Sequence, residues 1–273
     1  MKYLLYNPLA KGGKMNDFII KVVQKYDKKN IKVTPVSVLD DDKVKSVIET
    51  LSDFDEIEIA GGDGTLHKLL NEIDFGKIKS KIYFRKAGTG NDFARGHKGK
   101  VFEISKEIEN TPYFLINDKK YKFINGVGMG IDAYVCDSVN KNQKKESYYK
   151  TALRVFKEFK PFTIELDIDG KKEKFDNVFF FVCMNGKYIG GGMKIAPKAL
   201  RDDEWLDLYV ITSKNYKQLI RMMPLVLFGW HGILKKHVTY CRCKNVVATT
   251  FGCDMLQTDG EVIENVKKME IHR

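Results

Sequence analysis

The stretch from Ile57 to Leu66 (IEIAGGDGTL) constrains the fold of this chain more than any other. Its apolar beginning predicts a buried strand, and the leucines that end it and follow it recur at helical spacing. Between them stand three glycines and one carboxylate, that of Asp63. Glycines let the backbone approach a phosphate closely, and a helix N-terminus offers unpaired N–H donors to negative charge. The stretch predicts either an anion-binding cradle or a tight strand-to-helix turn without a ligand.

Asp63 favours the cradle. A carboxylate inside a phosphate cradle repels the phosphate unless a cation bridges the two charges, and carboxylate oxygens suit Mg²⁺. A nucleotide that carries Mg²⁺ is therefore the ligand that this stretch predicts.

Charge and length limit the classes of protein to which the chain can belong. Its 273 residues suffice for two domains, and its formal net charge of +11 favours anionic partners such as a nucleotide, a nucleic acid or an acidic membrane surface. We expect no signal peptide, and the longest apolar run, residues 222–230, is too short to span a bilayer. The expectation is a cytoplasmic protein that is soluble or peripheral to a membrane.

The five cysteines are scattered and odd in number, which indicates free thiols in a reducing compartment. Cys241 and Cys243, with His237 nearby, raise the alternative of a metal site, because residues two apart in an extended segment share a face. Free cysteine is commonly a small core residue, so buried thiols are the favoured interpretation.

Before Pro112, predicted strands alternate with predicted helices. This alternation favours a parallel sheet with helices on both faces, and ligands of such sheets bind beyond the carboxyl ends of the strands. The loops at Asn7, Gly61 and Ala87 each follow a strand and should converge there. Residues 1–111 are predicted to form a nucleotide-binding domain. The predicted strands are 3–6, 31–38, 57–60 and 82–84, and helical stripes lie at 18–26, 44–51 and 66–73.

From Tyr113 the pattern changes to strands separated by turn signals. It predicts an antiparallel β-sandwich as a second domain over residues 112–273, with the C-terminal end free to return to the first domain. The predicted strands are 113–116, 121–124, 163–168, 175–184, 206–211, 236–240 and 246–250, the first two joined by a turn at 117–120, and the predicted helices are 148–159 and 216–234.

A second glycine loop, residues 87–95 (AGTGNDFAR), follows the predicted strand 82–84. It repeats the combination of small residues, a hydroxyl, a carboxylate and a cation. A single loop of this kind is as readily a turn capped by Asp92 as a ligand site. Two such loops at the ends of neighbouring parallel strands favour a shared phosphate-binding site.

These motifs, in this order, resemble those of the soluble bacterial diacylglycerol kinases and lipid kinases, a family related to sphingosine and ceramide kinases. The resemblance spans nearly the whole chain. It rests on residues 7–8 and 12–13 (NP and GG), 61–65 (GGDGT), 88–95 (GTGNDFAR), 125–132 (NGVGMGID), 190–193 and 196–197 (GGGM and AP), 202–208 (DDEWLDL) and 259–261 (DGE).

The resemblance implies an N-terminal nucleotide domain, a C-terminal β-sandwich and an active site in the cleft between them. It also implies phosphoryl transfer from ATP with Mg²⁺ to a lipid hydroxyl, with diacylglycerol as the default acceptor. Asp92 would support phosphate and metal binding, Glu261 would be the proton acceptor, and Asp259 would be its neighbour. The residues expected at the nucleotide are Asn7, Lys11, Gly61, Gly62, Asp63, Gly64, Thr65, Gly88, Thr89 and Asn91.

Asp259 and Glu261 lie two positions apart, so in a strand both carboxylates would face the same side. From the residues alone, 259–261 is more readily a hairpin turn between the short apolar segments 255–256 and 262–263.

The acidic run 202–204 matches the place where the family holds a structural Mg²⁺. By resemblance Asp203 would supply a carboxylate, and Leu200 and Trp205 would supply backbone carbonyls, which suit a hard cation. The family usually has glycine where this chain has Glu204, so the loop departs from the pattern. A solvated turn is the alternative.

Many relatives have Asn-Glu after the Gly-Asp-Gly-Thr-Leu motif, whereas this chain has His67 and Lys68. A carboxylate has become a cation, which could pair with phosphate or face solvent. The rival functions are an NAD kinase and a catalytically silent lipid- or nucleotide-binding regulator. The second glycine loop opposes the first rival. The retained acidic residues oppose the second, because a binding module needs no general base. They are Asp63, Asp92, Asp259 and Glu261.

Two segments predict contact with an anionic membrane surface, where a lipid substrate would lie. A solvated helix face and a core helix are the alternatives. No stacking platform for nucleic acid is visible, and the resemblance suggests a homodimer, although the sequence leaves the oligomeric state open. The basic segment carries Lys141, Lys144, Lys145, Lys150, Arg154, Lys157 and Lys160, and the segment 219–234 places Phe228 and Trp230 beside His231, Lys235 and Lys236.

Overall fold

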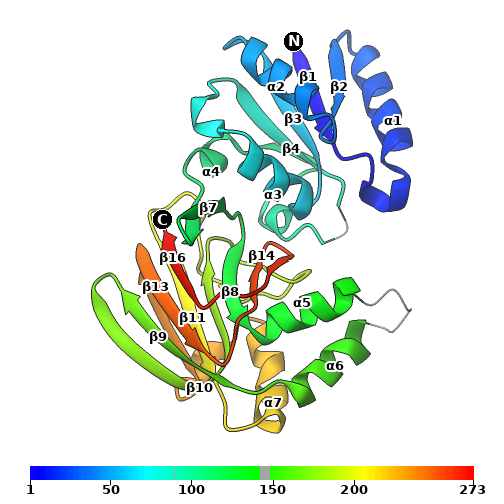
Figure 1. Cartoon of the computed structure of the whole chain (residues 1–273). Helices are drawn as coiled ribbons and strands as arrows, with labels where there is room; N and C mark the ends of the chain where they lie inside the picture. Colours follow the sequence, from blue (N-terminus) through cyan, green and yellow to red (C-terminus); the bar gives the residue numbers. More distant parts are fainter. Residues whose placement is uncertain (89, 142–147) are drawn as a thin grey trace. The chain divides into compact units, whose positions relative to one another are not determined.

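The computed structural model describes residues 1–88, 90–141 and 148–273 (Figure 1). These residues divide into two compact units, Met1–Thr111 and Pro112–Arg273. Each unit has its own sheet and its own hydrophobic core.

The first unit is a sheet of parallel strands alternating with helices, as the sequence predicts. The strand order is β2-β1-β3-β4-β5, and β5, which the sequence prediction misses, runs antiparallel to β4. The elements are β1 (Lys2–Tyr6), η1 (Ala10–Gly13), α1 (Met15–Asp27), β2 (Val33–Ser37), α2 (Asp41–Thr50), β3 (Glu56–Gly61), α3 (Asp63–Glu72), η2 (Phe75–Lys77), β4 (Lys81–Lys86), η3 (Phe93–Gly96), β5 (Val101–Glu103) and α4 (Ser105–Glu109).

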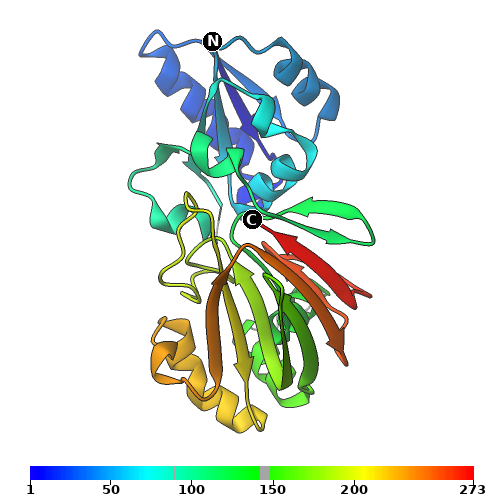
Figure 2. The same ribbon diagram turned by 90° about the vertical axis from the view of Figure 1, so that its left-hand side faces the viewer.

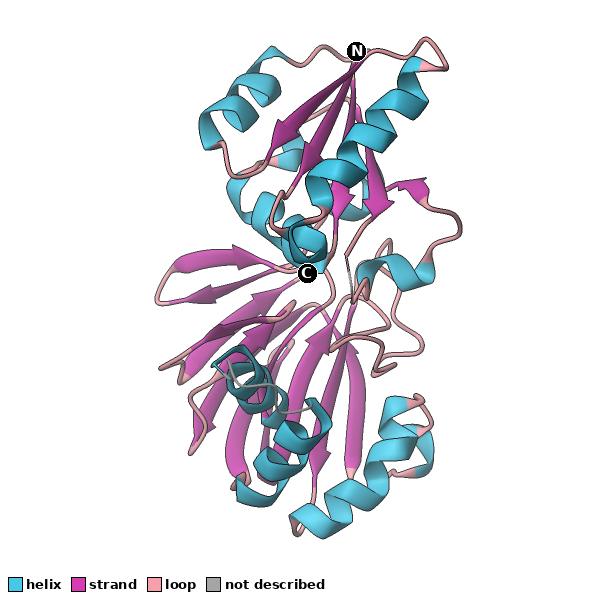
Figure 3. Ribbon diagram, turned by 90° about the vertical axis from the view of Figure 1, so that its right-hand side faces the viewer, coloured by secondary structure: helices cyan, strands magenta, loops and turns pink. Residues whose placement is uncertain are grey.

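Both faces of this sheet are covered by helices (Figure 3). Leu4 and Leu5 are adjacent in β1 and therefore point to opposite faces, and both are fully buried. On one face, Leu4 packs in a cluster with Met15, Ile19 and Val22 of α1. Burial on both faces explains why the strands of this unit are apolar runs rather than alternating patterns.

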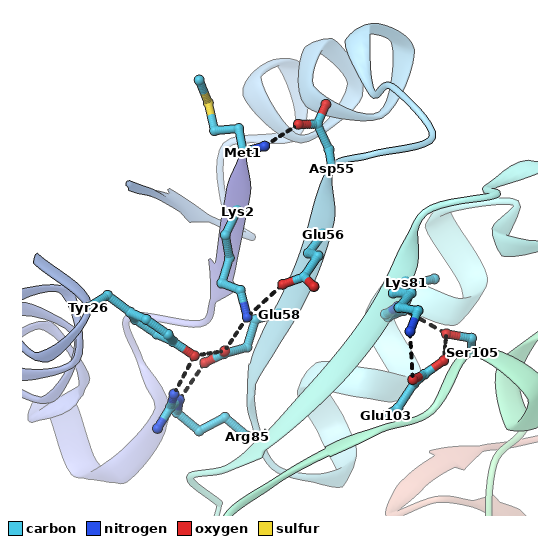
Figure 4. A network of polar contacts seen from close by, with 11 residues as sticks. Met1, Lys2, Tyr26, Asp55, Glu56, Glu58, Lys81, Arg85, Glu103 and Ser105 are labelled. Carbon is cyan, nitrogen blue, oxygen red and sulfur yellow. Dashed lines mark hydrogen bonds and ion pairs between the residues drawn. The ribbon is translucent and has the colours of Figure 1, made fainter. Parts of the chain in front are cut away.

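A buried carboxylate lies within the first unit. Glu58 of β3 is fully buried, pairs with Arg85 of β4, and accepts the hydroxyl of Tyr26 from α1 at 2.5 Å. The Nζ atom of Lys2 lies 3.6 Å from Glu58 and 3.0 Å from Glu56 (Figure 4). Burial raises the pKa of Tyr26, and the Glu58 carboxylate raises it further. The buried charge is tolerated because cations and a hydroxyl surround it, and the network ties α1 to three neighbouring strands.

The second unit is built on an antiparallel sheet (Figure 2). The strand order is β15-β14-β8-β10-β9-β13-β16-β6-β7, with β11 beside β10 and β12 beside β11. The elements are β6 (Tyr113–Ile116), β7 (Lys119–Lys122), β8 (Gly126–Gly130), α5 (Ile131–Lys141), α6 (Tyr148–Glu158), β9 (Phe162–Ile168), β10 (Lys171–Met184), β11 (Leu206–Thr212), α7 (Tyr216–Leu227), η4 (His231–Ile233), β12 (Val238–Cys243), β13 (Asn245–Phe251), β14 (Leu256–Thr258), β15 (Glu261–Ile263) and β16 (Lys268–His272).

Strand β10 lies between two hydrophobic cores. Phe181 and Cys183 point into one core, whereas Val182 and Met184 point into the other, where α7 packs. A strand that is buried on both faces needs cover on both sides, which the helices and the curved sheet provide. None of the helices in the described parts of the chain has the length and apolar character needed to cross a bilayer.

The sequence prediction misses β8, because glycine is rare in strands and this segment is rich in it. A Cβ atom on Gly128 would lie 2.3 Å from the carbonyl oxygen of Phe181, so glycine lets β8 pass close to β10. Gly130 has a φ of 124°, a conformation that side chains rarely adopt, and helix α5 begins directly after it.

Two of the predicted boundaries that differ from the structure do so because of residues with positive φ. The turn predicted over residues 117–120 consists of Asn117 and Asp118, with φ values of 48° and 65°, and β7 begins directly after them. The helix predicted to reach residue 234 ends at Leu227. Gly229 follows it with a φ of 73°, and a separate 3₁₀ turn covers His231–Ile233.

Candidate active site

The two glycine loops meet at one edge of the first sheet. Strands β3 and β4 are parallel neighbours, and the N–H of Ala87 donates to the carbonyl of Gly61 at 2.9 Å. A Cβ atom on Gly88 would lie 2.3 Å from the Cα atom of Gly62. Backbone meets backbone here, so neither glycine can carry a side chain. The predicted convergence of these loops is confirmed.

Asp63 joins the two loops. Its carboxylate accepts the N–H of Asp92 at 2.9 Å and the N–H of Phe93 at 2.8 Å. The ring of Phe93 is fully buried and meets Phe84 edge-on. The sequence predicts that Asp63 needs a bridging cation, but in the structure both of its oxygens face backbone donors of the second loop. Asp63 therefore holds the shape of the cradle.

The second glycine loop is also held by its own side chains. Asn91 has a φ of 53°, and its Nδ2 atom donates to the carbonyl of Gly88 at 2.5 Å. The buried carboxylate of Asp92 accepts a hydrogen bond from the Nε atom of Arg95 at 3.3 Å. Thr89, which the resemblance places at the nucleotide, lies outside the described residues. These contacts fix the described part of the loop to the protein.

The loop after β1 lies at the same edge, because Tyr6 of β1 is in register with Ala60 of β3. The Oδ1 atom of Asn7 accepts the N–H of Leu9 at 3.0 Å. The Nζ atom of Lys11 lies 4.1 Å from the ring centre of Phe18 on α1. The Lys11 side chain therefore packs on α1. Its backbone has a φ of 57°.

Helix α3 carries the residues that follow the first glycines. Thr65 is buried and packs over Gly61, where a Cβ atom would lie 2.5 Å from the Thr65 side chain. Lys68 pairs with Glu72 one turn along and lies 3.5 Å from Asp41 of α2. The cation that departs from the family pattern thus pairs with carboxylates of the protein itself.

In the second unit, Asp259 and Gly260 form the turn of a hairpin. Strand β14 pairs with β15, Thr258 lies opposite Glu261, and the turn residues have φ values of 48° and 96°. The prediction that Asp259 and Glu261 share one side of a strand is wrong, because the chain reverses between them. The alternative drawn from the residues alone, a hairpin turn, is confirmed.

The two carboxylates of this hairpin have different surroundings. Asp259 is buried, and it accepts the N–H of Ile124 at 2.7 Å and the N–H of Asn125 at 2.8 Å. These amides immediately precede β8, so Asp259 clasps two segments that are remote in sequence. Glu261, by contrast, is exposed to solvent. Asp259 is suited to positioning the hairpin, whereas the carboxylate of Glu261 is accessible to a substrate.

Asp132 is a half-buried acid with a buried carboxylate, and the motifs do not place it among the predicted site residues. It lies in the first turn of α5, and both carboxylate oxygens are buried without a hydrogen-bond partner among the described residues. Burial raises the pKa of Asp132 to about 7. The backbone N–H groups of Asp132 and Ala133 lower the pKa in part, although neither forms a hydrogen bond with the carboxylate. One turn along, the Sγ atom of Cys136 lies 3.1 Å from the carbonyl oxygen of Gly260. A charged residue directly after an apolar, glycine-rich run was the available sequence signal.

Arginine side chains bind the loop that the resemblance predicts to hold a structural Mg²⁺. The carboxylate of Asp203 pairs with Arg242 and accepts the N–H of Trp205 at 3.0 Å. The carbonyl of Asp203 accepts a hydrogen bond from the Nε atom of Arg273 at 2.9 Å. Leu200 and Trp205, the expected carbonyl ligands, lie on either side of this arginine-bound segment. Across the described residues, no group of three or more His, Cys, Asp or Glu side chains could hold a metal.

The cysteines are free thiols, as predicted. Cys243 is buried, and burial raises the pKa of Cys241 to about 12. The Nε2 atom of His237 lies 3.0 Å from the side-chain nitrogen of Gln218. The geometry supports the buried-thiol interpretation of this segment.

Comparison with known families assigns both units. The model of the diacylglycerol kinase catalytic domain matches residues 2–113, and that of the YegS C-terminal NAD kinase beta sandwich-like domain matches residues 125–270. The chain belongs to the diacylglycerol kinase and lipid kinase family. It is therefore a member of a kinase family, with a nucleotide-domain fold followed by a β-sandwich-like fold.

Individual relatives of this kinase-family member agree. It is 25% identical to the diacylglycerol kinase of Bacillus subtilis over 270 residues, which is 94% of this chain and 88% of the relative. It is 28% identical over 229 residues to YtlR of the same organism, covering 75% of this chain and 73% of the relative. A crystal structure of a diacylglycerol kinase from Bacillus anthracis superposes with a TM-score of 0.71 at 23% identity, covering 100% of this chain and 94% of that one, which supports the fold.

Asp63→Ala should loosen the second glycine loop. The substitution deletes two hydrogen bonds from backbone N–H groups to a charged acceptor, each worth roughly 1.5–3 kcal/mol. Circular dichroism should show a lower thermal midpoint. Asp53→Ala is the matched control, because Asp53 is an exposed acid of the same unit. Equal thermal midpoints for the two variants would show that Asp63 does not stabilise the second glycine loop.

Asp132→Asn should stabilise the second unit at pH 8 but not at pH 4. The folded pKa of about 7 exceeds the ordinary value of 3.8. The folded state therefore holds an extra proton between these values, and the parent loses stability as the pH rises through this window. Beyond pH 7 the penalty is on the order of 2–4 kcal/mol, and the neutral amide should remove it.

The measurement is the thermal midpoint of parent and Asp132→Asn across that pH range. Asp118→Asn serves as the control, since Asp118 is exposed in a hairpin turn of the same unit. A difference between parent and Asp132→Asn that is the same at pH 4 and pH 8 would count against a buried titrating acid.

Proposed function

We propose that this protein is a lipid kinase that transfers the γ-phosphoryl group of Mg²⁺-ATP to the hydroxyl of a diacylglycerol-like lipid. The product would be phosphatidic acid or an analogue of it. The observation that carries the proposal is the backbone contact between Gly62 and Gly88, which brings two glycine loops together at one edge of the sheet. The family membership of both units supports the same reaction class.

The proposed nucleotide site lies at the carboxyl ends of β1, β3 and β4. Glycines without side chains let the phosphates approach the backbone, where N–H groups at the start of α3 can donate. Asp92 is the acid proposed to support metal and phosphate, and Mg²⁺ would neutralise the charge that develops during transfer. Asp63 keeps the cradle in shape. The other proposed contacts are Asn7, Lys11, Gly61, Gly62, Gly64, Thr65, Gly88, Thr89 and Asn91.

Glu261 is the proposed general base. A lipid hydroxyl is a weak nucleophile until a base accepts its proton. In the proposed step the Glu261 carboxylate takes that proton, the hydroxyl oxygen bonds to the γ-phosphorus, and the bond to the β-phosphate oxygen breaks to release ADP. Asp259 would act on this step indirectly, because its oxygens hold the backbone of Ile124 and Asn125 and so fix the hairpin that carries Glu261.

The test is a transfer assay with radiolabelled ATP and three acceptors: diacylglycerol in mixed micelles, NAD, and no acceptor. We expect label in the lipid alone. Glu261→Gln should lower the rate by roughly 10²–10⁴-fold, the range typical for loss of a general base, while ATP binding and thermal midpoint stay near those of the parent. Asp259→Asn is the matched variant. It should lower the midpoint as well as the rate, since an amide cannot accept all of these N–H donors.

Three results would overturn the proposal or its roles. Label in NAD would identify a small-molecule kinase with the same cradle. Parent protein that labels no acceptor but binds ATP would favour a silent regulator. Normal turnover by Glu261→Gln would remove Glu261 from the role of base.

We also propose that the protein works at an anionic membrane surface through the segment after α7. Phe228, Trp230 and Ile233 are 63%, 62% and 77% exposed. Lys235 and Lys236 follow them and are exposed. Apolar side chains beside cations suit the boundary between headgroups and acyl chains. His231 does not belong to this surface, because it is buried against Tyr209 and burial lowers its pKa.

The basic segment supports this proposal less well. Lys141 pairs with Asp137 and Glu264, each at 2.9 Å, and Arg154 lies 3.8 Å from Glu158. Lys144 and Lys145 lie outside the described residues.

The double variant Phe228→Ala, Trp230→Ala should therefore bind anionic vesicles about tenfold or more weakly than the parent. Parent binding should also fall with salt, because exposed charges are screened. Phe54→Ala is the control, since Phe54 is a 94% exposed aromatic of the other unit. Sedimentation with vesicles of phosphatidylglycerol and phosphatidylcholine measures both effects. Equal binding of the double variant and the control would refute the proposed contact.

A further inference from the structure

The acidic loop before β11 is surrounded by cationic side chains of its own unit. Arg242 of β12 pairs with the carboxylate of Asp203, and Lys244 lies 2.8 Å from the carboxylate of Glu204. Strands β11 and β12 are antiparallel neighbours, with Leu206 opposite Cys243. The register of the sheet thus places Arg242, near the end of β12, and Lys244, directly after it, beside the acids that lead into β11.

A second arginine binds the backbone of the loop. The side chain of Arg273 donates from Nε to the carbonyl of Asp203 at 2.9 Å and from a terminal nitrogen to the carbonyl of Arg201 at 2.8 Å. The N–H of Arg273 donates to the carbonyl of Lys244 at 2.9 Å, which fixes the start of this side chain. One guanidinium group therefore joins two loop carbonyls, as a hard cation would.

The Trp205 ring lies beside both cations. The guanidinium carbon of Arg242 lies 5.5 Å from its centre, and the Nζ atom of Lys244 lies 5.1 Å from it. These are cation–π distances, and they align both cations toward the loop. Glu204 stands where the family usually has glycine, and in this chain it has a lysine partner. The replacement of glycine by Glu204 therefore adds an ion pair with Lys244 to the loop.

We propose that Arg242, Arg273 and Lys244 replace the divalent cation of this loop, so that the second unit of this protein folds without a structural metal. A metal ion at the loop would need the Asp203 carboxylate and nearby carbonyls. The Asp203 carboxylate is already paired with the guanidinium group of Arg242, and the carbonyls of Arg201 and Asp203 are bound by that of Arg273. An ion could take these oxygens only by displacing the two guanidinium groups.

The loop that Arg273 binds is also connected to the hairpin that carries Glu261, the proposed base. Arg201, whose carbonyl Arg273 holds, donates to the carbonyl of Ile124 at 3.3 Å and to the Oδ1 atom of Asn125 at 2.6 Å. The N–H groups of these same two residues bind Asp259. The arginine-bound loop thus supports the backbone that Asp259 clasps.

The experiment uses the full chain and reads stability and metal content rather than activity. The parent is dialysed against EDTA, and its thermal midpoint is compared with and without millimolar Mg²⁺ or Ca²⁺. Inductively coupled plasma mass spectrometry counts the ions retained on purification. We expect no tightly bound divalent ion and an unchanged midpoint. The double variant Arg242→Ala, Arg273→Ala should lose several degrees, and added Mg²⁺ should restore part of the loss because the Asp203 carboxylate is then open.

Arg221→Ala is the matched control, since Arg221 is an exposed arginine on α7 of the same unit. If the double variant fails to fold, Arg242→Lys takes its place. It keeps the charge but loses the fork of donors, and it should show a smaller fall in the midpoint. One divalent ion per chain, or a parent midpoint that falls in EDTA, would overturn the proposal. So would a double variant as stable as Arg221→Ala.

Discussion

The first unit depends on the close approach of two backbone segments at Gly62 and Gly88. Neither position has room for a Cβ atom, so the loops after β3 and β4 must keep glycine for the strands to end as they do. This contact sets the distance between α3 and the second loop. Asp63 can then bridge them by accepting the N–H groups of Asp92 and Phe93. The cradle is thus preorganised by the fold, which is what an electrostatic site for phosphate requires.

The acidic residues of the motifs share one structural device. Asp63 and Asp259 each use their oxygens to hold backbone amides of a segment that is distant in the sequence. In both cases a carboxylate ties its motif to a second segment of the same unit. Asp203 departs from this pattern, because its carboxylate also meets the side chain of Arg242. Lys68 is paired in a similar way, with Glu72 one turn along α3.

Much of the fold could be predicted from the sequence. Periodicity located β1 to β4 and the helices between them, since apolar runs and helical stripes are local patterns. It failed at β8, whose glycines serve the close approach of β10, and at α5, whose start follows a glycine with positive φ. The strand β8 and the start of α5 both depend on the segments against which they pack. The sequence likewise gave no sign that an arginine remote from residues 201–203 would bind their carbonyls.

The amino-acid sequence by itself determined the family, the order of the motifs and the residue types at the cradle, because these depend on local spacing. The tertiary structure decided what each acid does. Asp259 and Glu261 are two positions apart, yet one is buried against amides and the other is exposed, because the chain reverses at a turn with positive φ. Asp132 became a group with a pKa near 7 because packing removed water from its carboxylate. Burial, reversal and pairing with remote side chains arise only when distant segments meet, and no local pattern encodes them.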